Sequence, residues 1–230
     1  MVNRDNIIAF IERTTGYRYG ETVGTLKTTD AHTGEEINNH LRRRMAYFAI
    51  DANNIDEIVL SAMFLAWFGD GIPTKRDMKA RKFQKMSESF IRIYFEDVLS
   101  RNFANSGEVL QEEMILIEQL LVRQLSETGE SYTIGFLQNW IGYIHLYFYA
   151  LLMLNEREEV AKYRNASFFK FASIPCNDLV STRIFKNFNI DINNDIPFME
   201  CNDADVIRDC NRKIENALDG KLTKLEYVFS

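Results

Sequence analysis

A run of 25 residues without a formal charge, residues 131–155, constrains the fold of this chain more than any other feature. Charged residues make up 26% of the sequence, so an uncharged segment of this length is exceptional within it. As a helix, the segment is long enough either to be buried by neighbouring helices on most sides or to face lipid. The rest of the chain must therefore pack around it.

Glycine and polar residues gather on one face of this expected helix. At about 100° per residue, the spacing i, i+3, i+4 and i+7 places them next to one another. Polar groups near the middle of a lipid-facing helix are costly, so this face favours protein neighbours over a single membrane span at 134–154. We call this face the seam; it consists of Gly135, Gln138, Gly142, His145 and Tyr149.

The seam has two interpretations. The glycines would allow another backbone to come close, and the buried amide and imidazole would then need hydrogen-bond partners from that neighbour. This is a packing groove with a satisfied core histidine, and we favour it. The alternative is a small ligand pocket whose polar wall is Gln138, His145 and Tyr149.

Further helices are expected from apolar residues at helical spacing. Thr33 and Glu36 form a T-x-x-E capping box, which predicts a helix from there to residue 50. Its buried face is expected to carry Ile37, Leu41, Met45 and Phe48. The other helices are expected at residues 4–13, 55–68, 74–103 and 108–125, with 156–164 prolonging the central helix.

The sequence becomes less regular after residue 165. Prolines, Asn and Asp are frequent there, with helical patterns only near 178–187 and 203–218, and residues 224–229 (KLEYVF) predict an edge strand. We therefore expect an all-α, single-domain multi-helix bundle around the central uncharged helix (131–155). Residues 1–165 would form the bundle, and residues 166–230 a less regular C-terminal extension packed on it.

Composition narrows the cellular setting. The three cysteines are odd in number and lie in no CxxC pair, which disfavours a disulfide framework or a zinc cluster. The N-terminal residues do not resemble a secretory signal, so we expect a cytoplasmic protein. A net charge of −6 disfavours general nucleic-acid binding and is compatible with a basic protein partner.

A metal site is one hypothesis for the start of the helix predicted from residue 33. Glu36 and His40 are four residues apart on that helix, and His32 lies just before it. Imidazole and carboxylate are suitable ligands for zinc or iron. The pattern is weak, because it contains no HExxH and Glu36 already has a capping role. We expect no cofactor.

Two clusters of basic residues support a second hypothesis, contacts with nucleic-acid phosphates. The charges of the second cluster scatter around a helical wheel, which is more typical of a solvated helix surface. The first cluster is Arg42, Arg43 and Arg44, and the second is Lys75, Arg76, Lys79, Arg81, Lys82 and Lys85.

No catalytic fingerprint is present: the chain contains no glycine-rich phosphate loop and no GxSxG elbow. The sequence therefore favours a non-enzymatic protein–protein interaction protein, such as an adaptor, an inhibitor or a subunit of a larger assembly, or a homo-oligomer. The expected contact is apolar surface on the 55–68 helix or the edge formed by residues 224–229. The alternatives are a nucleic-acid-associated subunit using residues 42–44 and 75–85, and a small-molecule or metal-dependent enzyme.

Overall fold

A computed structural model describes residues 2–26, 32–67, 120, 133–164, 167–170, 172–176, 178–192 and 198–230. Within these residues the chain forms α-helices, two short 3-10 helices and no strand, which confirms the predicted all-α, multi-helix fold. The helices predicted at 74–103 and 108–125 lie outside the described residues, apart from Leu120. The helices are α1 (Arg4–Thr15), α2 (Gly34–Ile50), α3 (Ile55–Trp67), α6 (Ile134–Leu154), α7 (Glu158–Ala161), α8 (Asp178–Phe188), α9 (Ala204–Leu218) and α10 (Lys224–Val228), and the 3-10 helices are η2 (Ser167–Lys170) and η3 (Phe198–Glu200).

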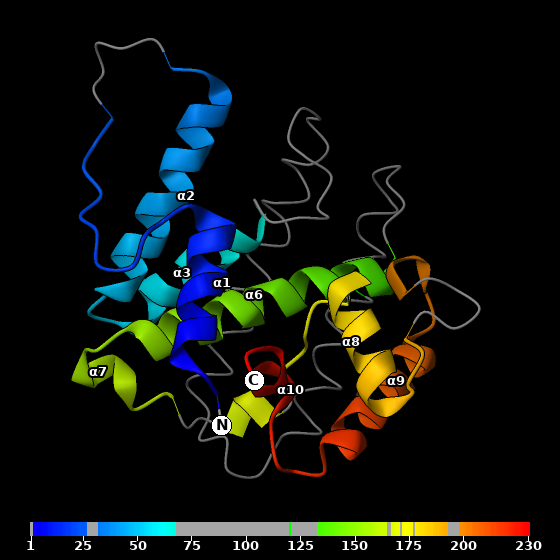
Figure 1. The fold of residues 1–230 in the computed structure, drawn as a ribbon. Coiled ribbons are helices and arrows are strands. Elements are labelled where there is room, and N and C mark those ends of the chain that lie inside the picture. Colours follow the sequence, from blue (N-terminus) through cyan, green and yellow to red (C-terminus); the bar gives the residue numbers. More distant parts are fainter. Residues whose placement is uncertain are drawn as a thin grey trace.

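Helix α6 is the central element, as the uncharged stretch predicts. It runs through the body of the molecule, with α1 across one part of it and α8 near its N-terminal end (Figure 1). It contacts α1, α2, α3, α10 and η3, and all of its residues except Phe136 and Met153 are buried. A helix that is apolar all round needs such neighbours on every side.

The central helix stops sooner than expected. Residues 156–164 do not prolong it, because Asn155 leaves the helical conformation and its side-chain Oδ1 accepts a hydrogen bond from the backbone N–H of Arg157 at 2.9 Å. The chain then forms only the single turn α7. An asparagine that bonds the backbone two residues ahead replaces a helical hydrogen bond with a turn.

Helix α2 begins as predicted. The Thr33 hydroxyl accepts a hydrogen bond from the Glu36 backbone N–H, and the Glu36 carboxylate accepts one from the Thr33 N–H. Its predicted buried face is confirmed only in part: Leu41 and Met45 are half-buried and Met45 packs against the core, but Ile37 and Phe48 are 40% and 45% exposed. Only Ala46 and Ala49 are buried, because α2 rises away from the body (Figure 1).

The C-terminal part is built from short helices and extended chain, as expected, but residues 224–229 are not an edge strand. They form α10, because Thr223 and Glu226 make a second capping box of the same kind as that of α2. Helix α10 lies against the start of the chain, where the Asn6 side-chain amide donates to the Phe229 carbonyl at 3.0 Å. The two ends of the chain thus share one packed region (Figure 1).

One membrane prediction can be checked on the described helices. None of them combines the length and the apolar character that crossing a bilayer requires, and this includes α6.

Candidate functional site

The seam of α6 lies directly against other backbone. A Cβ atom on Gly142 would lie 2.5 Å from both the Ile174 oxygen and the Pro175 nitrogen. A Cβ on Gly135 would lie 2.9 Å from the Phe198 carbonyl carbon, and the Gly135 N–H donates to the Cys201 carbonyl at 2.9 Å. Only glycine allows this approach without displacing the neighbouring chain.

Polar side chains of α6 hold the extended segment 172–176 in the seam. Gln138 Nε2 donates to the Ser173 hydroxyl at 2.5 Å, and the Ser173 backbone N–H donates to His145 Nδ1 at 2.9 Å. Next to the seam, Asn139 accepts a hydrogen bond from the Cys176 N–H at 2.8 Å. These bonds explain how buried polar groups are tolerated at the centre of the protein.

His145 is therefore a neutral core histidine in this arrangement. It is fully buried, and burial lowers its pKa to about 3. The third polar residue of the seam, Tyr149, is also buried and lines a cavity of about 920 Å³ between α6, η2 and the loop joining α9 to α10. The structure thus places Gln138 and His145 against the chain's own backbone, while Tyr149 reaches a cavity wall.

The three arginines of α2 have partners within the chain. An Arg42 guanidinium nitrogen donates to the Thr14 carbonyl, and Arg43 pairs with Glu21 at 2.8 Å. The Arg44 guanidinium lies over the Phe48 ring, 5.0 Å from its centroid. These contacts tie α2 to the end of α1 and to the segment after it, or cover the surface of α2 itself. Lys75, Arg76, Lys79, Arg81, Lys82 and Lys85 lie outside the described residues.

The predicted metal ligands do not form a cluster. Within the described part of the chain, which includes His32, Glu36 and His40, no three His, Cys, Asp or Glu side chains are grouped as a metal ion requires. The Glu36 carboxylate is engaged by Thr33, and that backbone hydrogen bond lowers its pKa. Burial and the nearby arginines Arg44 and Arg43 lower the pKa of His40.

Cys176 and Cys210 do not present activated thiols. Burial raises the pKa of the Cys176 thiol well above its usual range, and it raises that of Cys210 to about 11. A nucleophilic cysteine needs the opposite shift, because the thiolate is the reactive form.

The first of two surface features that sequence reasoning did not locate is a groove between α2 and α3. Its volume is about 470 Å³. Phe48 of α2 and Leu60 of α3 line it and are 45% and 42% exposed. Asp51 and Glu57 add two carboxylates to its walls. We call this the α2–α3 groove.

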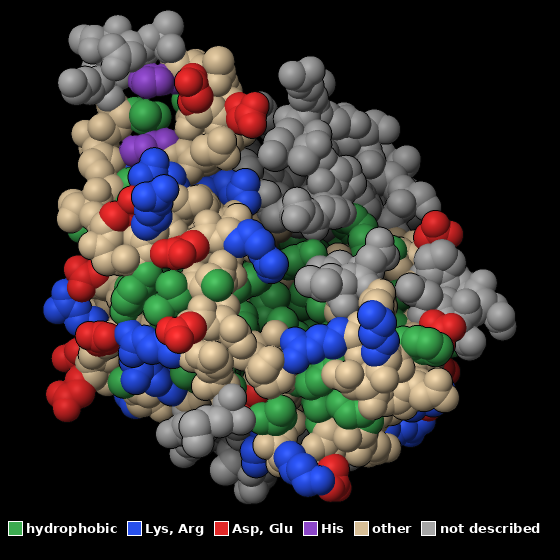
Figure 2. Space-filling view, in the orientation of Figure 1, with side chains coloured by type: hydrophobic (Ala, Val, Ile, Leu, Met, Phe, Trp, Pro, Cys, Tyr) green, Lys and Arg blue, Asp and Glu red, His purple; other side chains and the backbone are tan. Residues whose placement is uncertain are grey.

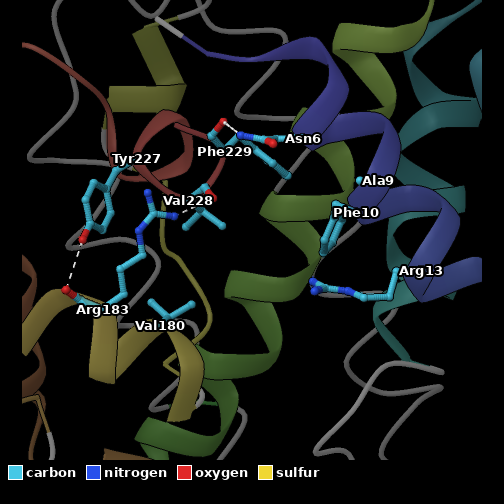
Figure 3. A pocket seen from close by; sticks show the side chains of 9 residues that line it. All are labelled: Asn6, Ala9, Phe10, Arg13, Val180, Arg183, Tyr227, Val228 and Phe229. Carbon is cyan, nitrogen blue, oxygen red and sulfur yellow. Dashed lines mark hydrogen bonds between the residues drawn. The ribbon is translucent and has the colours of Figure 1, made fainter.

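The second feature is a cleft of about 480 Å³ between α1, α8 and α10. Figure 3 shows the elements that supply its walls: α1 on one side, α8 on the other, and the end of α10 between them. Apolar groups provide most of the lining, and two arginines and an asparagine provide the polar part. We call this the α1–α8 cleft; it is lined by Asn6, Ala9, Phe10, Arg13, Val180, Arg183, Tyr227, Val228 and Phe229.

Aromatic packing makes the floor of the α1–α8 cleft rigid. The Phe10 ring meets the Phe229 ring edge-on at 5.4 Å and also contacts Tyr147 of α6 at 5.1 Å. Phe229 in turn stacks on Tyr149 at 5.9 Å. The floor is therefore an extension of the core and is anchored to α6.

The two arginines of the cleft differ in their contacts. Arg183 is held by the chain: Nη1 donates to the Val228 carbonyl at 3.2 Å, and Nη2 to the Ser230 carbonyl at 2.9 Å and its hydroxyl at 3.1 Å. Its guanidinium also lies 4.7 Å from the centroid of the Tyr227 ring. Arg13, in contrast, is exposed and has no hydrogen bond or ion pair within the described residues.

Comparisons with protein-family models, with curated proteins and with solved structures give no match. The chain's own geometry must therefore carry any functional argument. The residues of the α1–α8 cleft come from both ends of the chain, so no local motif could have indicated them. The α2–α3 groove does have a signal in the sequence, the apolar stripe of α2, although the stripe by itself predicts burial in the core.

Proposed function

We propose that this chain is a non-enzymatic protein–protein interaction protein and that its α2–α3 groove receives the partner. One observation carries the proposal: the apolar stripe of α2, which its spacing predicts to be buried, ends at the surface. Phe48 on α2 and Leu60 on α3 line the groove and remain 45% and 42% exposed. Apolar side chains grouped around a groove are typical of protein interaction sites.

The groove selects the chemistry of the partner. Its apolar part suits the apolar face of an amphipathic helix, which commonly binds in a groove between two helices. Asp51 and Glu57 line the same groove; Asp51 already pairs with Arg157 at 2.6 Å, whereas Glu57 has no ion pair within the described residues, and the chain as a whole has a net charge of −6. We therefore expect a partner helix with Lys or Arg beside its apolar residues, since opposite charges favour association and set orientation.

The test compares two exposed phenylalanines. Phe48→Ser alters the groove, whereas Phe185→Ser removes a similarly exposed ring from α8, at 51%, far along the chain. Native mass measurement of complexes recovered from the source cell should show a partner of fixed stoichiometry with the unchanged protein and with Phe185→Ser. That partner should be lost with Phe48→Ser. A peptide taken from the partner, with the sequence of a basic amphipathic helix, should bind the unchanged protein on its own.

Two outcomes would overturn the proposal. If Phe48→Ser destabilises the isolated chain by more than about 1 kcal/mol, the ring is covered by the chain itself and is not a free surface. If the partner is retained by Phe48→Ser, or lost equally with Phe185→Ser, the groove does not bind it. If the recovered complex contains only copies of this chain, the groove binds a second copy of the chain and not a different protein.

A further inference from the structure

The α1–α8 cleft is independent of the proposed partner groove and has its own chemistry. Its volume of about 480 Å³ lies within the range of small-molecule sites, which are mostly apolar with a few polar groups. Figure 2 shows apolar side chains lining a hollow between the surfaces of α1 and α8, with Lys and Arg side chains beside it. The cleft therefore combines an apolar floor with positive charge.

The charge in the cleft is of one sign. Arg13 and Arg183 both line it, and no Asp or Glu is among its lining residues. Neither guanidinium pairs with an Asp or Glu side chain anywhere in the described residues. Figure 3 shows the Arg13 side chain running past the Phe10 ring toward the cleft, while Arg183 lies on the opposite wall. An anionic group between them would find donors on both sides.

The donors that remain suit a carboxylate. A guanidinium has five N–H groups in a planar fork, and those of Arg13 are all unused within the described residues. Arg183 uses three of its five on Val228 and Ser230, which fixes its position and leaves two. A planar fork matches the two oxygens of a carboxylate in a bidentate contact.

The floor of the cleft determines the part of the ligand that is not charged. Phe10, Val180 and Phe229 are nearly fully buried, and they present a surface on which an alkyl chain or ring could lie. Because aromatic contacts hold this surface against α6, it needs no rearrangement before binding. An anion without an apolar body would leave this surface unused.

We propose that the α1–α8 cleft binds a small carboxylate with an apolar body, such as a medium-chain fatty acid, with Arg13 as its principal charged contact. Arg183 is the second contact and also holds the wall formed by α10. The site is a binding site without a chemical step.

Calorimetric titration of the full chain with octanoate tests this proposal. Octanoate should bind, octan-1-ol should bind roughly tenfold more weakly, and acetate should show no measurable binding. The tenfold difference corresponds to one charge-assisted hydrogen-bonded contact of ordinary strength. Octanoate binding should also weaken at high salt, because the contact is electrostatic and partly exposed.

Two matched variants locate the binding. Arg13→Gln removes the free guanidinium and should weaken octanoate binding roughly tenfold. Arg18→Gln removes the same charge from an exposed residue outside the cleft and should leave binding unchanged. Both residues are exposed, so thermal unfolding of both variants should match that of the unchanged chain.

Each contrary outcome overturns the proposal. Absence of octanoate binding removes the site. Equal binding of octanoate and octan-1-ol, or equal binding by the Arg13→Gln and unchanged chains, would show that charge has no role. Octyl phosphate binding tenfold more tightly than octanoate would replace the carboxylate with a phosphate as the preferred group.

Discussion

Helices α6 and α2 are both long and both carry apolar residues at helical spacing, yet the structure uses them in opposite ways. Of the 21 residues of α6 all but two are buried, whereas only two of the 17 residues of α2 are. Backbone from the C-terminal part enters the seam of α6. Helix α2 is held near its end, where Ala46 and Ala49 are buried, and along its side, where Arg42 bonds Thr14 of α1 and Arg43 pairs with Glu21.

The difference between α6 and α2 shows when the pattern of apolar residues predicts the burial of a helix. A run without any charge demands burial on all sides, so the position of α6 followed from its sequence. An apolar stripe on a charged helix indicates only that the stripe contacts another apolar surface, which can belong to the same chain or to a partner. In α2 the stripe meets the core through Met45, but Phe48 stays exposed, and this is why we propose a partner for that part of it.

Glycine substitutions should show the contrast most strongly. Gly142→Ala places a methyl group against the backbone of Ile174 and Pro175, and we expect a loss of about 3 kcal/mol in the free energy of unfolding. Gly34→Ala at the start of α2 meets nothing within 4 Å, so its effect should stay within about 0.5 kcal/mol. Urea denaturation measures both, and similar values for the two variants would refute the close approach at the seam.

Asn155 joins the two regions and should have the next largest effect. Its side-chain Nδ2 donates to the Ala49 carbonyl at 3.0 Å and to the Ala52 carbonyl at 2.9 Å, at the end of α2. Asn155→Ala leaves both carbonyls without this donor in a buried site, which should cost about 2 kcal/mol. Exposed Asn53 offers a control, since Asn53→Ala should be nearly neutral in the same denaturation experiment.

Acid should weaken the seam through His145. Its pKa is about 3 in the folded chain and about 6.5 in the unfolded chain, so below pH 6.5 only the unfolded chain gains a proton there. Stability from this residue is complete above pH 6.5 and is lost as the pH falls, by about 1.4 kcal/mol for each pH unit. Denaturation at pH 7, 6 and 5 should therefore be flatter for His145→Asn; parallel profiles would contradict a buried neutral imidazole.

A conservative pair gives the smallest and most direct contrast. Ile144→Val on α6 removes a methylene group from a fully buried side chain and should cost about 1 kcal/mol. Ile37→Val on α2, where the side chain is 40% exposed, should change stability by less than about 0.5 kcal/mol. A larger loss at Ile37 than at Ile144 would reverse our assignment of the two helices.

Local sequence patterns predicted where helices form better than they predicted how buried those helices are. The capping box of α2 and the glycine face of α6 are both short-range signals, and the structure contains both. The same rule applied to Thr223 and Glu226 would have predicted α10. The β-forming residues of KLEYVF predict a strand, but the cap before them favours a helix, and the structure contains the helix.

The candidate sites depended on contacts that no local pattern encodes. The α1–α8 cleft joins residues near 10, 180 and 228, and its two arginines gain meaning only when those segments meet. Arg42 and Arg43 show the converse, because a basic cluster became a set of internal contacts once Thr14 and Glu21 were placed beside it. The basic residues can be identified from the sequence, but their partners within the fold cannot.

The occupied seam also bears on how the chain folds as it is made. Ser173, which bonds Gln138, is added 35 residues later, so at usual rates of translation α6 exists for on the order of seconds before its groove can be filled. During that interval its glycine face and unpaired polar groups are open to other surfaces. Chains stalled with α6 outside the ribosomal exit tunnel and Ser173 still inside it should therefore bind chaperones more than longer ones do.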